Sequence, residues 1–349
     1  MPVMLVDMDY FYAACEELRH PEFKGKPLIV GNASANDKTR GVVQTCNYEA
    51  RAFGIHSGMP LSDAFKLKPD VNYLESDEGY YERESLQIMA MLRSYSFRME
   101  VMSIDEAALD LDGMDYGEAL ELAKKVKKSI TERFGLKCTI GISSTKTYAK
   151  MACDAAKPDG LLVIEDSQVL EFISGKNIGK LPGIGKKTGS ILNGMGVHTI
   201  GEIAKLDPTL LMTKLGSFGI EIYLTAKGKD PSKVIEQGAA LSISRERTIS
   251  FRPASAEALD KMLHTLADEV WDELNKQGYW FRGVSLKVRY NDFTEHIKNR
   301  SFSNNEGSKE LIYESAKKML EGVEKGKRIR KIGVRVFGLV QRKGQKTLA

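Results

Sequence analysis

Short apolar runs that suit β-strands alternate with amphipathic stretches that suit α-helices through the first half of the chain. Strands are predicted over residues 1–9, 27–31, 41–45, 107–111, 138–142 and 161–164, with one more near residue 101. Helices are predicted over residues 11–18, 47–53, 61–68, 79–97, 116–134 and 145–156, and residues 32–38 are rich in turn formers. This alternation predicts an α+β sheet with helices on one side.

The second half of the chain changes character twice. Residues 166–232 are punctuated by glycine and predict only helices, and residues 228–240 predict a linker. Residues 240–342 predict strand, helix, strand, strand, helix and strand, which is the split β-α-β pattern. The helices are expected over 255–277 and 308–325, and the strands near 241–251, 281–290, 294–303 and 331–341.

Two strands of this C-terminal pattern separate an apolar face from a basic one. Lys287, Arg289 and Arg335 alternate with aliphatic residues, so they are expected on the polar face. The first strand does not separate its two faces as cleanly, because Arg245 and Arg247 alternate in step with isoleucines and are expected on the same face as them. The basic face is a candidate surface for a polyanion.

Two apolar runs end in carboxylates about a hundred residues apart. The first ends in Asp7, Met8 and Asp9, and the second ends in Asp105 and Glu106. Alternate side chains of a strand share a face, so Asp7 and Asp9 point the same way, whereas Asp105 and Glu106 diverge unless the strand turns there. On neighbouring strands, three such carboxylates would form a site suited to Mg²⁺, and two ions about 4 Å apart are the usual apparatus for phosphoryl transfer. Taken singly, each run more often ends in a helix cap.

Composition and charge narrow the class of protein. No basic N-terminal region precedes a long apolar run, so neither a signal peptide nor a membrane span is expected. The four cysteines are scattered, which favours reduced thiols in the cytoplasm over disulfides or a zinc site. The net charge of +4 is uneven, because residues 240–349 carry 22 Lys and Arg against 14 Asp and Glu. A polyanionic partner for this region and a plain solvated surface both fit that excess.

A glycine-rich turn between two predicted helices is typical of a helix-hairpin-helix. It spans residues 181–185, includes Gly183 and Gly185, and is followed by Lys186 and Lys187. The glycines let backbone N–H groups approach a phosphate, and the next helix N-terminus and the lysines add positive charge. Such a hairpin holds the DNA backbone without reading bases. A plain helical hairpin is the alternative.

Two further segments are candidates for phosphate binding. Tyr48 and Arg51 lie three residues apart, on one face of a predicted helix, where a hydroxyl and a guanidinium could clamp a triphosphate. Lys157 stands at a Lys-Pro-Asp-Gly turn and offers a point charge. Each of these residues alone is more often a surface ion pair or a turn residue.

Together and in this order, these motifs resemble those of the Y-family DNA polymerases, the translesion class, of the DNA polymerase IV type found in archaea and bacteria. The resemblance covers residues 1 to about 342. It rests on residues 7–13 (DMDYFYA), 45–51 (TCNYEAR), 103–107 (SIDEA), 141–143 (GIS), 157–160 (KPDG), 181–185 (LPGIG) and 242–248 (SISRERT).

The resemblance implies a right-hand polymerase. Its ferredoxin-like palm would comprise residues 1–19 and 77–166, its fingers 20–76, its helix-hairpin-helix thumb 167–232 and its β-α-β-β-α-β little finger 241–342, with a linker at 233–240 and a tail at 343–349. The implied activity is template-directed addition of deoxynucleotides to a primer 3′-hydroxyl with release of pyrophosphate. Low fidelity, low processivity, no proofreading and a monomeric state are also implied.

The resemblance also assigns roles to residues. Asp7, Asp105 and Glu106 would bind two Mg²⁺ with help from the Met8 carbonyl. Tyr12 would exclude the 2′-hydroxyl of a ribonucleotide, and Asp9 is taken as structural. The triphosphate would be held by Thr45, Tyr48, Arg51, Lys157 and the backbone of Tyr10 and Phe11. DNA would contact Gly183, Gly185, Lys186, Lys187, Arg245, Arg247, Lys287, Arg289 and Arg335.

The chain departs from the family pattern at two places. Val42 and Gln44 would neighbour the templating base, where the family tends to carry a small residue in place of Gln44. The last residues, 345–349, match only the first half of a sliding-clamp peptide. Two rival functions are another palm-domain enzyme, such as a nucleotide cyclase, and an inactive DNA-binding scaffold. Tight primer-template binding argues against the first, and Mg²⁺-dependent incorporation argues against the second.

Overall fold

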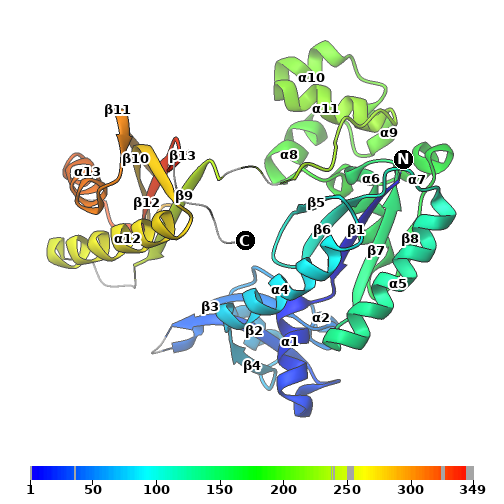
Figure 1. Ribbon diagram of the computed structural model, residues 1–349, viewed down its shortest axis with the longest axis horizontal. Coiled ribbons are helices and arrows are strands. Elements are labelled where there is room, and N and C mark those ends of the chain that lie inside the picture. Colours follow the sequence, from blue (N-terminus) through cyan, green and yellow to red (C-terminus); the bar gives the residue numbers. More distant parts are fainter. Residues whose placement is uncertain are drawn as a thin grey trace. The chain divides into compact units, whose positions relative to one another are not determined.

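The structure is a computed structural model that describes residues 2–34, 37–236, 238, 240–249, 255–323 and 327–342. The chain divides into two compact units, Met1–Gln237 and Gly238–Ala349. Among the described residues, the first unit contains two sheets and a helical region, and the second contains one main sheet and two helices (Figure 1). None of the described helices is long and apolar enough to cross a membrane. The tail expected at 343–349 lies outside the described residues.

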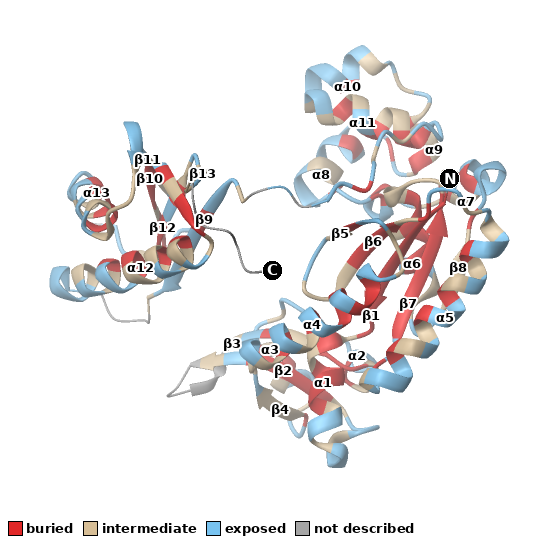
Figure 2. Cartoon of the chain, viewed as in Figure 1, coloured by how far each residue is buried: buried red, intermediate tan, exposed pale blue. Residues whose placement is uncertain are grey.

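Five strands form the main sheet of the first unit, in the order β5-β6-β1-β7-β8 (Figure 1). They are β1 (Val3–Met8), β5 (Arg98–Val101), β6 (Glu106–Asp110), β7 (Cys138–Ser143) and β8 (Leu161–Val163). β1 pairs antiparallel with β6 and β7, whereas β7 and β8 are parallel. The central β1 is buried along its whole length, as Figure 2 shows.

Helices cover both faces of this sheet, so the prediction of helices on one side is wrong. One face packs against α1 (Phe11–Arg19), α4 (Glu78–Arg93) and α5 (Tyr116–Phe134). The other face, which includes Val3 and Leu5, packs against α6 (Lys146–Ala156). Gly141 permits the close approach of α6, because a Cβ there would lie 2.1 Å from the Ala149 carbonyl oxygen. A strand that is apolar at nearly every position, such as β1, is typical of such two-sided burial.

A smaller sheet with the order β3-β2-β4 follows α1 and the short 3₁₀ helix η1 (Pro21–Phe23). Its strands are β2 (Leu28–Ser34), β3 (Asp37–Cys46) and β4 (Asn72–Glu75), and its helices are α2 (Tyr48–Arg51) and α3 (Leu61–Leu67). Strand structure extends into residues 32–38, which are rich in turn formers, because β2 and β3 continue into that segment and Ser34 pairs with Asp37. The sequence pattern missed β4.

Short helices fill the segment after β8, as predicted. They are η2 (Asp166–Gln168), α7 (Val169–Ser174), η3 (Ile178–Lys180), α8 (Lys186–Gly194), α9 (Ile200–Ile203), α10 (Pro208–Leu215) and α11 (Ser217–Ala226). Their core continues onto α6, where the Tyr148 hydroxyl donates to the Thr225 carbonyl oxygen at 2.7 Å.

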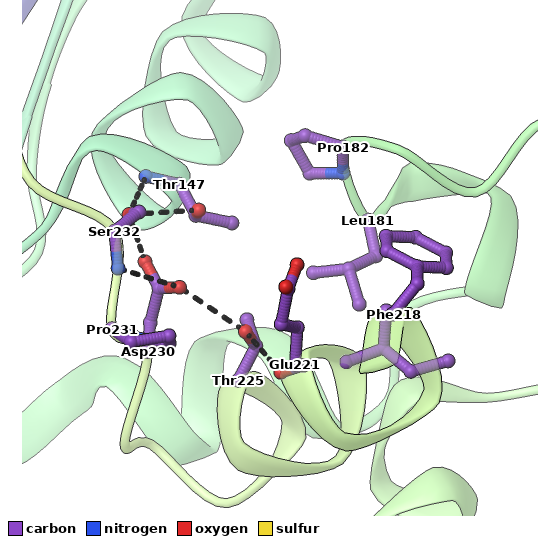
Figure 3. Close-up of a pocket in the computed structure, with 10 residues that line it drawn as sticks. Thr147, Leu181, Pro182, Phe218, Glu221, Thr225, Asp230, Pro231 and Ser232 are labelled. Carbon is purple, nitrogen blue, oxygen red and sulfur yellow. Dashed lines mark hydrogen bonds between the residues drawn. The ribbon is translucent and has the colours of Figure 1, made fainter. Parts of the chain in front are cut away.

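A cavity of about 270 Å³ lies at this junction of the short helices with α6. Figure 3 shows the hydrogen bonds that join Ser232 to Thr147 and to Asp230 beside it. None of the residues predicted to act in catalysis or binding lines this cavity.

The second unit has the predicted strand and helix order. Its elements are β9 (Ser242–Thr248), α12 (Ala256–Lys276), β10 (Tyr279–Tyr290), β11 (Glu295–Glu306), α13 (Lys309–Glu321), β12 (Ile329–Phe337) and β13 (Val340–Gln341). The strands pair antiparallel in the order β11-β10-β12-β9. Val284, Leu286 and Val288 of β10 pack with Leu266 of α12 and Ile312 of α13, so both helices cover the same face of the sheet.

Candidate active site

The ends of β1 and β6 bring two of the predicted carboxylates together. The strand register places Asp7 opposite Glu106, on the face that α6 covers. The Lys150 ammonium of α6 lies 2.9 Å from Asp7 Oδ2, 2.9 Å from Glu106 Oε1 and 3.2 Å from Asp154 Oδ1. The Lys157 ammonium lies 2.7 Å from the same Asp7 oxygen. Two cations therefore neutralise this pair of carboxylates, of which Asp7 is buried and Glu106 is partly buried.

Asp105 lies in the turn between β5 and β6, so the acidic run does turn at this point. Glu106 begins β6 instead of ending β5, and the Asp105 carbonyl oxygen accepts from the Met8 N–H at 2.9 Å. The half-buried Asp105 carboxylate accepts from the Ser103 hydroxyl at 2.5 Å. Burial, and after it the charge of Asp105, raises the pKa of Tyr12. Asp105 therefore faces the Tyr12 side of the site.

Burial and neighbouring charges act in opposite directions on the pKa values of Glu106 and Lys150. Burial raises the pKa of Glu106, and the Lys150 ammonium opposes that rise. Burial also disfavours the charge on Lys150, but Asp7 and Glu106 outweigh it and raise the pKa of Lys150. The lysine is therefore charged at neutral pH and holds two carboxylates that would otherwise repel each other.

The donor set fits a divalent cation. Asp7, Asp105 and Glu106 offer only oxygen atoms, which hard cations such as Mg²⁺ prefer. In the described part of the chain, no three His, Cys, Asp or Glu side chains already converge around one point. The position between Asp7 and Glu106 instead holds the Lys150 ammonium, which stands in for a cation there. Asp7, Asp105 and Glu106 are the residues that would hold such an ion.

The turn from β1 into α1 presents backbone donors beside these carboxylates. Tyr10 adopts a left-handed backbone with φ 38° and ψ 46°, and α1 begins at the next residue, Phe11. The first N–H groups of a helix have no partner within it, so they can bind an anion. The Met8 side chain is buried in the core, which leaves its backbone carbonyl as the group that could ligate a metal.

Tyr48 and Arg51 share a face of α2, as their spacing predicts. The Arg51 guanidinium lies 4.9 Å from the centroid of the Tyr48 ring. The Tyr48 ring also meets the Tyr10 ring edge-on at 5.3 Å, which ties α2 to the start of α1. Burial, and then the charge of Asp9, raises the pKa of Tyr48 to about 12, so its hydroxyl is a neutral donor at pH 7.

A cavity of about 370 Å³ is lined by the start of α1 and the β5–β6 turn, together with β3 of the smaller sheet. It is lined by Phe11, Tyr12, Val42, Val43, Gln44, Thr45, Gly58, Ile104 and Asp105. The Tyr12 ring stacks on the fully buried Tyr81 ring at 4.2 Å. Gln44 Nε2 donates to Glu78 Oε1 at 3.3 Å. The cavity thus gathers the predicted sugar filter, the predicted template neighbours and one predicted metal ligand.

The helical hairpin has the backbone that its glycines predict. Gly183 has a φ of 89°, and a Cβ there would lie 3.1 Å from the Phe218 ring. Lys186 and Lys187 are exposed at the start of α8, next to the exposed Gly185. The element before the turn is only the single 3₁₀ turn η3, so the hairpin is shorter than two full helices.

The basic residues of the second unit divide between two sides of its sheet. Arg245 and Arg247 of β9 pair with Glu273 and Glu269 of α12, on the side that the helices cover. Lys287, Arg289 and Arg335 lie on the opposite, open side. The five residues therefore do not form one surface.

Glutamates also occupy the open side of this sheet. Glu246 contacts Lys331 at 2.9 Å and Lys287 at 3.4 Å, and Glu295 contacts Arg289. The positive charge of the open side is partly neutralised within the domain.

Sequence reasoning missed two residues of the first unit. Lys150 was not singled out, although Lys150, Asp154 and Lys157 are spaced four and three residues apart, as on one helix face. Asp9 was taken as structural, yet its carboxylate lies 3.4 Å from the Tyr48 hydroxyl. No local signal reveals either contact, because the partners are far away in the sequence.

Comparisons with known proteins agree with this architecture. Residues 6–154 match the impB/mucB/samB family, and residues 240–348 match the impB/mucB/samB family C-terminal domain. The DNA polymerase IV of Methanoculleus marisnigri is 39% identical over 335 residues, which cover 96% of this chain and 93% of that protein. The DNA polymerase IV of Methanosarcina acetivorans is 37% identical and covers 99% of this chain and 98% of its own.

Solved structures of similar proteins share the fold. A Y-family DNA polymerase chimera of Dbh and Dpo4 superimposes with a TM-score of 0.91 at 30% identity, covering 98% of this chain and all of that chain. An insertion ternary complex of Dbh DNA polymerase gives a TM-score of 0.71 at 29% identity with the same coverage.

The fold and the oxygen-rich site define a right-hand polymerase with palm, fingers, thumb and little finger. The chain belongs to the impB/mucB/samB family, that is, to the Y-family DNA polymerases of the DNA polymerase IV type, and it is a DNA-directed DNA polymerase.

Proposed function

We propose that this polymerase extends a primer on a DNA template past damaged bases, using two Mg²⁺ ions bound by Asp7, Asp105, Glu106 and the Met8 carbonyl. The observation that carries the proposal is the carboxylate pair of Asp7 and Glu106, which shares one cation position. Asp105, from the adjoining turn, lines a cavity of about 370 Å³. A deoxynucleoside triphosphate in that cavity would have its reacting phosphate at the carboxylates.

The residues of the chain position the reactants. Tyr48, Arg51 and Lys157 would bind the triphosphate, with Thr45 and the backbone N–H groups of Tyr10 and Phe11 assisting. The Lys157 ammonium, which lies 2.7 Å from Asp7, would leave that carboxylate for a phosphate. When bound, the divalent ions lower the pKa of the primer 3′-hydroxyl and neutralise charge on the departing pyrophosphate. Catalysis of this kind is mostly positioning and charge stabilisation.

Tyr12 is proposed as the filter against ribonucleotides. Its ring is fixed by stacking on Tyr81 and lines the same cavity as Asp105. A rigid ring under the sugar would collide with a 2′-hydroxyl. Val42 and Gln44 are proposed to lie beside the templating base, where Gln44, held by Glu78, would limit the size of the lesion that the pocket accepts.

The proposed domains of the right-hand fold favour a short-lived complex with DNA. Palm at 1–19 and 77–166, fingers at 20–76, thumb at 167–232, linker at 233–240 and little finger at 241–342 are the proposed divisions. We propose primer-template contacts by Gly183, Gly185, Lys186 and Lys187 in the thumb and by the basic residues of the little finger. The small fingers sheet favours low fidelity and low processivity, and we propose that the enzyme does not proofread.

Further expectations concern the binding partners, the oligomeric state and the cellular location of the enzyme. The proposed partners are primer-template DNA and deoxynucleoside triphosphates, and the neighbour solved as an insertion ternary complex of Dbh polymerase supports both. The proposed monomeric state, the cytoplasmic location and a sliding clamp that binds the C-terminal tail remain predictions. The tail lies outside the described residues.

Primer extension in the presence of Mg²⁺ tests the proposal. Asp105→Ala should reduce the rate at least about a hundredfold, because a lost metal ligand weakens transition-state stabilisation. Asp112→Ala is the matched control, since this exposed acid contacts Arg98 and lies outside the cavity. Activity of Asp105→Ala within about tenfold of the parent would remove the metal-site assignment. A parent protein that binds DNA but incorporates no nucleotide would instead support an inactive scaffold.

A further inference from the structure

Asp9 is a buried carboxylate whose contacts come from three separate elements. Its side chain is 2% exposed. Oδ1 accepts from the Thr139 hydroxyl of β7 at 2.9 Å and lies 3.4 Å from the Tyr48 hydroxyl of α2. Oδ2 accepts from the Asp159 backbone N–H at 2.8 Å, in the turn after α6. Both oxygens are engaged, so the plane of the carboxylate is fixed.

Two of these contacts lead to groups that the proposed function assigns to the triphosphate. Tyr48 contributes its own hydroxyl. Asp159 stands two residues after Lys157, so its N–H fixes the turn that carries the lysine. The Asp159 side chain anchors the same turn, with Lys127 and Lys137 each at 2.8 Å. A single carboxylate therefore joins a phosphate-binding group of the fingers to a phosphate-binding turn of the palm.

We propose that Asp9 is a positioning residue that sets the spacing between the Tyr48 hydroxyl and the Lys157 turn before the nucleotide arrives. This inference rests on the proposed function and adds a residue that does not touch the substrate. Groups that are already in place lose less conformational entropy on binding, so preorganisation raises affinity. The Tyr48 contact is the longest of the three, so the Tyr48 hydroxyl can turn to a phosphate while the other two contacts persist.

The Thr139 contact supplies a matched control. Thr139 binds the same carboxylate from β7, and neither its side chain nor β7 lines the nucleotide cavity. Thr139→Val removes this hydrogen bond with little change of shape. It leaves the contacts of Asp9 with Tyr48 and with the Lys157 turn.

The test measures nucleotide binding without chemistry. The parent and variants are bound to a primer-template with a dideoxy-terminated primer in Mg²⁺, and the Kd for the matching deoxynucleotide is titrated by fluorescence. Asp9→Ala should raise this Kd about tenfold or more, Asp9→Asn should raise it less because its amide oxygen still accepts one bond, and Thr139→Val should leave it within about twofold. Thermal unfolding checks that each variant is folded.

A double substitution tests whether Asp9 acts on nucleotide binding through Tyr48. If Asp9 acts partly through Tyr48, Asp9→Ala should raise the Kd by a smaller factor in a Tyr48→Phe background than in the parent. An unchanged Kd for both folded Asp9 variants would overturn the inference, as would a Thr139→Val effect as large as that of Asp9→Ala. If Tyr48→Phe and Lys157→Ala also leave the Kd unchanged, the proposed triphosphate residues fail. If those two raise it and the Asp9 variants do not, only the Asp9 inference fails.

Discussion

Replacing Lys150 with methionine should destabilise the metal-free protein by as much as about 3 kcal/mol at pH 7. The substitution keeps most of the aliphatic stem and removes the ammonium that lies 2.9 Å from both Asp7 and Glu106. The facing carboxylate oxygens can then be no more than about 6 Å apart, and at an effective dielectric constant of about 20 two charges at that distance repel by about 3 kcal/mol. This is an upper value, because the Lys157 ammonium still lies 2.7 Å from Asp7 and offsets part of the repulsion. Protonation limits the loss, because a proton placed at pH 7 on a carboxyl with an ordinary pKa of 4.5 costs about 3.4 kcal/mol.

The pH dependence of the loss has a definite sign. Without Lys150, the pKa of Glu106 in the folded protein rises further above its unfolded value, since burial already raises it and the opposing ammonium is gone. The folded state then binds more protons than the unfolded state, so its stability increases as the pH falls. The difference between the parent and Lys150→Met should therefore be smaller at pH 5 than at pH 7.

Chemical denaturation with and without divalent ions measures both effects. In EDTA, Lys150→Met should lower the free energy of unfolding, and in a parallel thermal melt it should lower the melting temperature by up to roughly 12 °C. Millimolar Mn²⁺ or Mg²⁺ should stabilise it more than the parent, because the metal no longer competes with an ammonium. Lys146→Met is the control, since Lys146 lies one turn earlier on α6 and pairs with Glu100 at 2.7 Å, away from Asp7. A loss below about 1 kcal/mol, or equal metal responses of the two variants, would refute the reasoning.

Two other predictions address the sugar filter and the little finger. Tyr12→Ala should reduce discrimination against ribonucleotides about a hundredfold in single-nucleotide incorporation, because in the proposed role the ring stacked on Tyr81 would fill the space for a 2′-hydroxyl; unchanged discrimination would exclude the role. Arg335→Ala, on the open side of the sheet, should weaken DNA binding and lower the salt slope by about one. Arg245→Ala, paired with Glu273, should lower stability more than DNA affinity; equal losses of affinity would contradict the division of the two sides.

Local signals explain the elements that the sequence predicted well. The helix expected over 116–134 is observed as α5 with these bounds, and local sequence signals mark both its start and its end. Asp115 and Glu118 form a capping box, and Gly135 closes the helix with a φ of 67°. The order of elements in the second unit could also be predicted from local signals, since each strand and helix has its own period of hydrophobic positions.

Packing explains what the sequence left open. The apolar run of β1 indicated a buried strand, but the pattern does not tell which helix covers which face, and helices were wrongly expected on one side only. The strand pairing of Ser34 with Asp37 overrides a segment whose composition favours turns. The short β4 has no distinct period and forms only because β2 offers a parallel edge. In the site, the pairing of Asp7 with Glu106 was predicted, whereas the lysine between them comes from a helix 143 residues later.

The different surroundings of Asp7 and Asp9 explain why two carboxylates two residues apart suit different tasks. Asp9 is bound by a backbone N–H and a hydroxyl that belong to fixed elements, so neither oxygen is free for a metal. Asp7 is bound by the ammonium groups of Lys150 and Lys157, which sit at the ends of flexible side chains. Under the proposed function, these ammonium groups would leave Asp7 when a divalent cation and a triphosphate supply the same charges, and Asp154 lies within 3.9 Å of both lysines. The end of β1 thus carries two kinds of carboxylate. Asp9 is fixed and positions other groups, whereas Asp7 has exchangeable partners and could bind a metal ion.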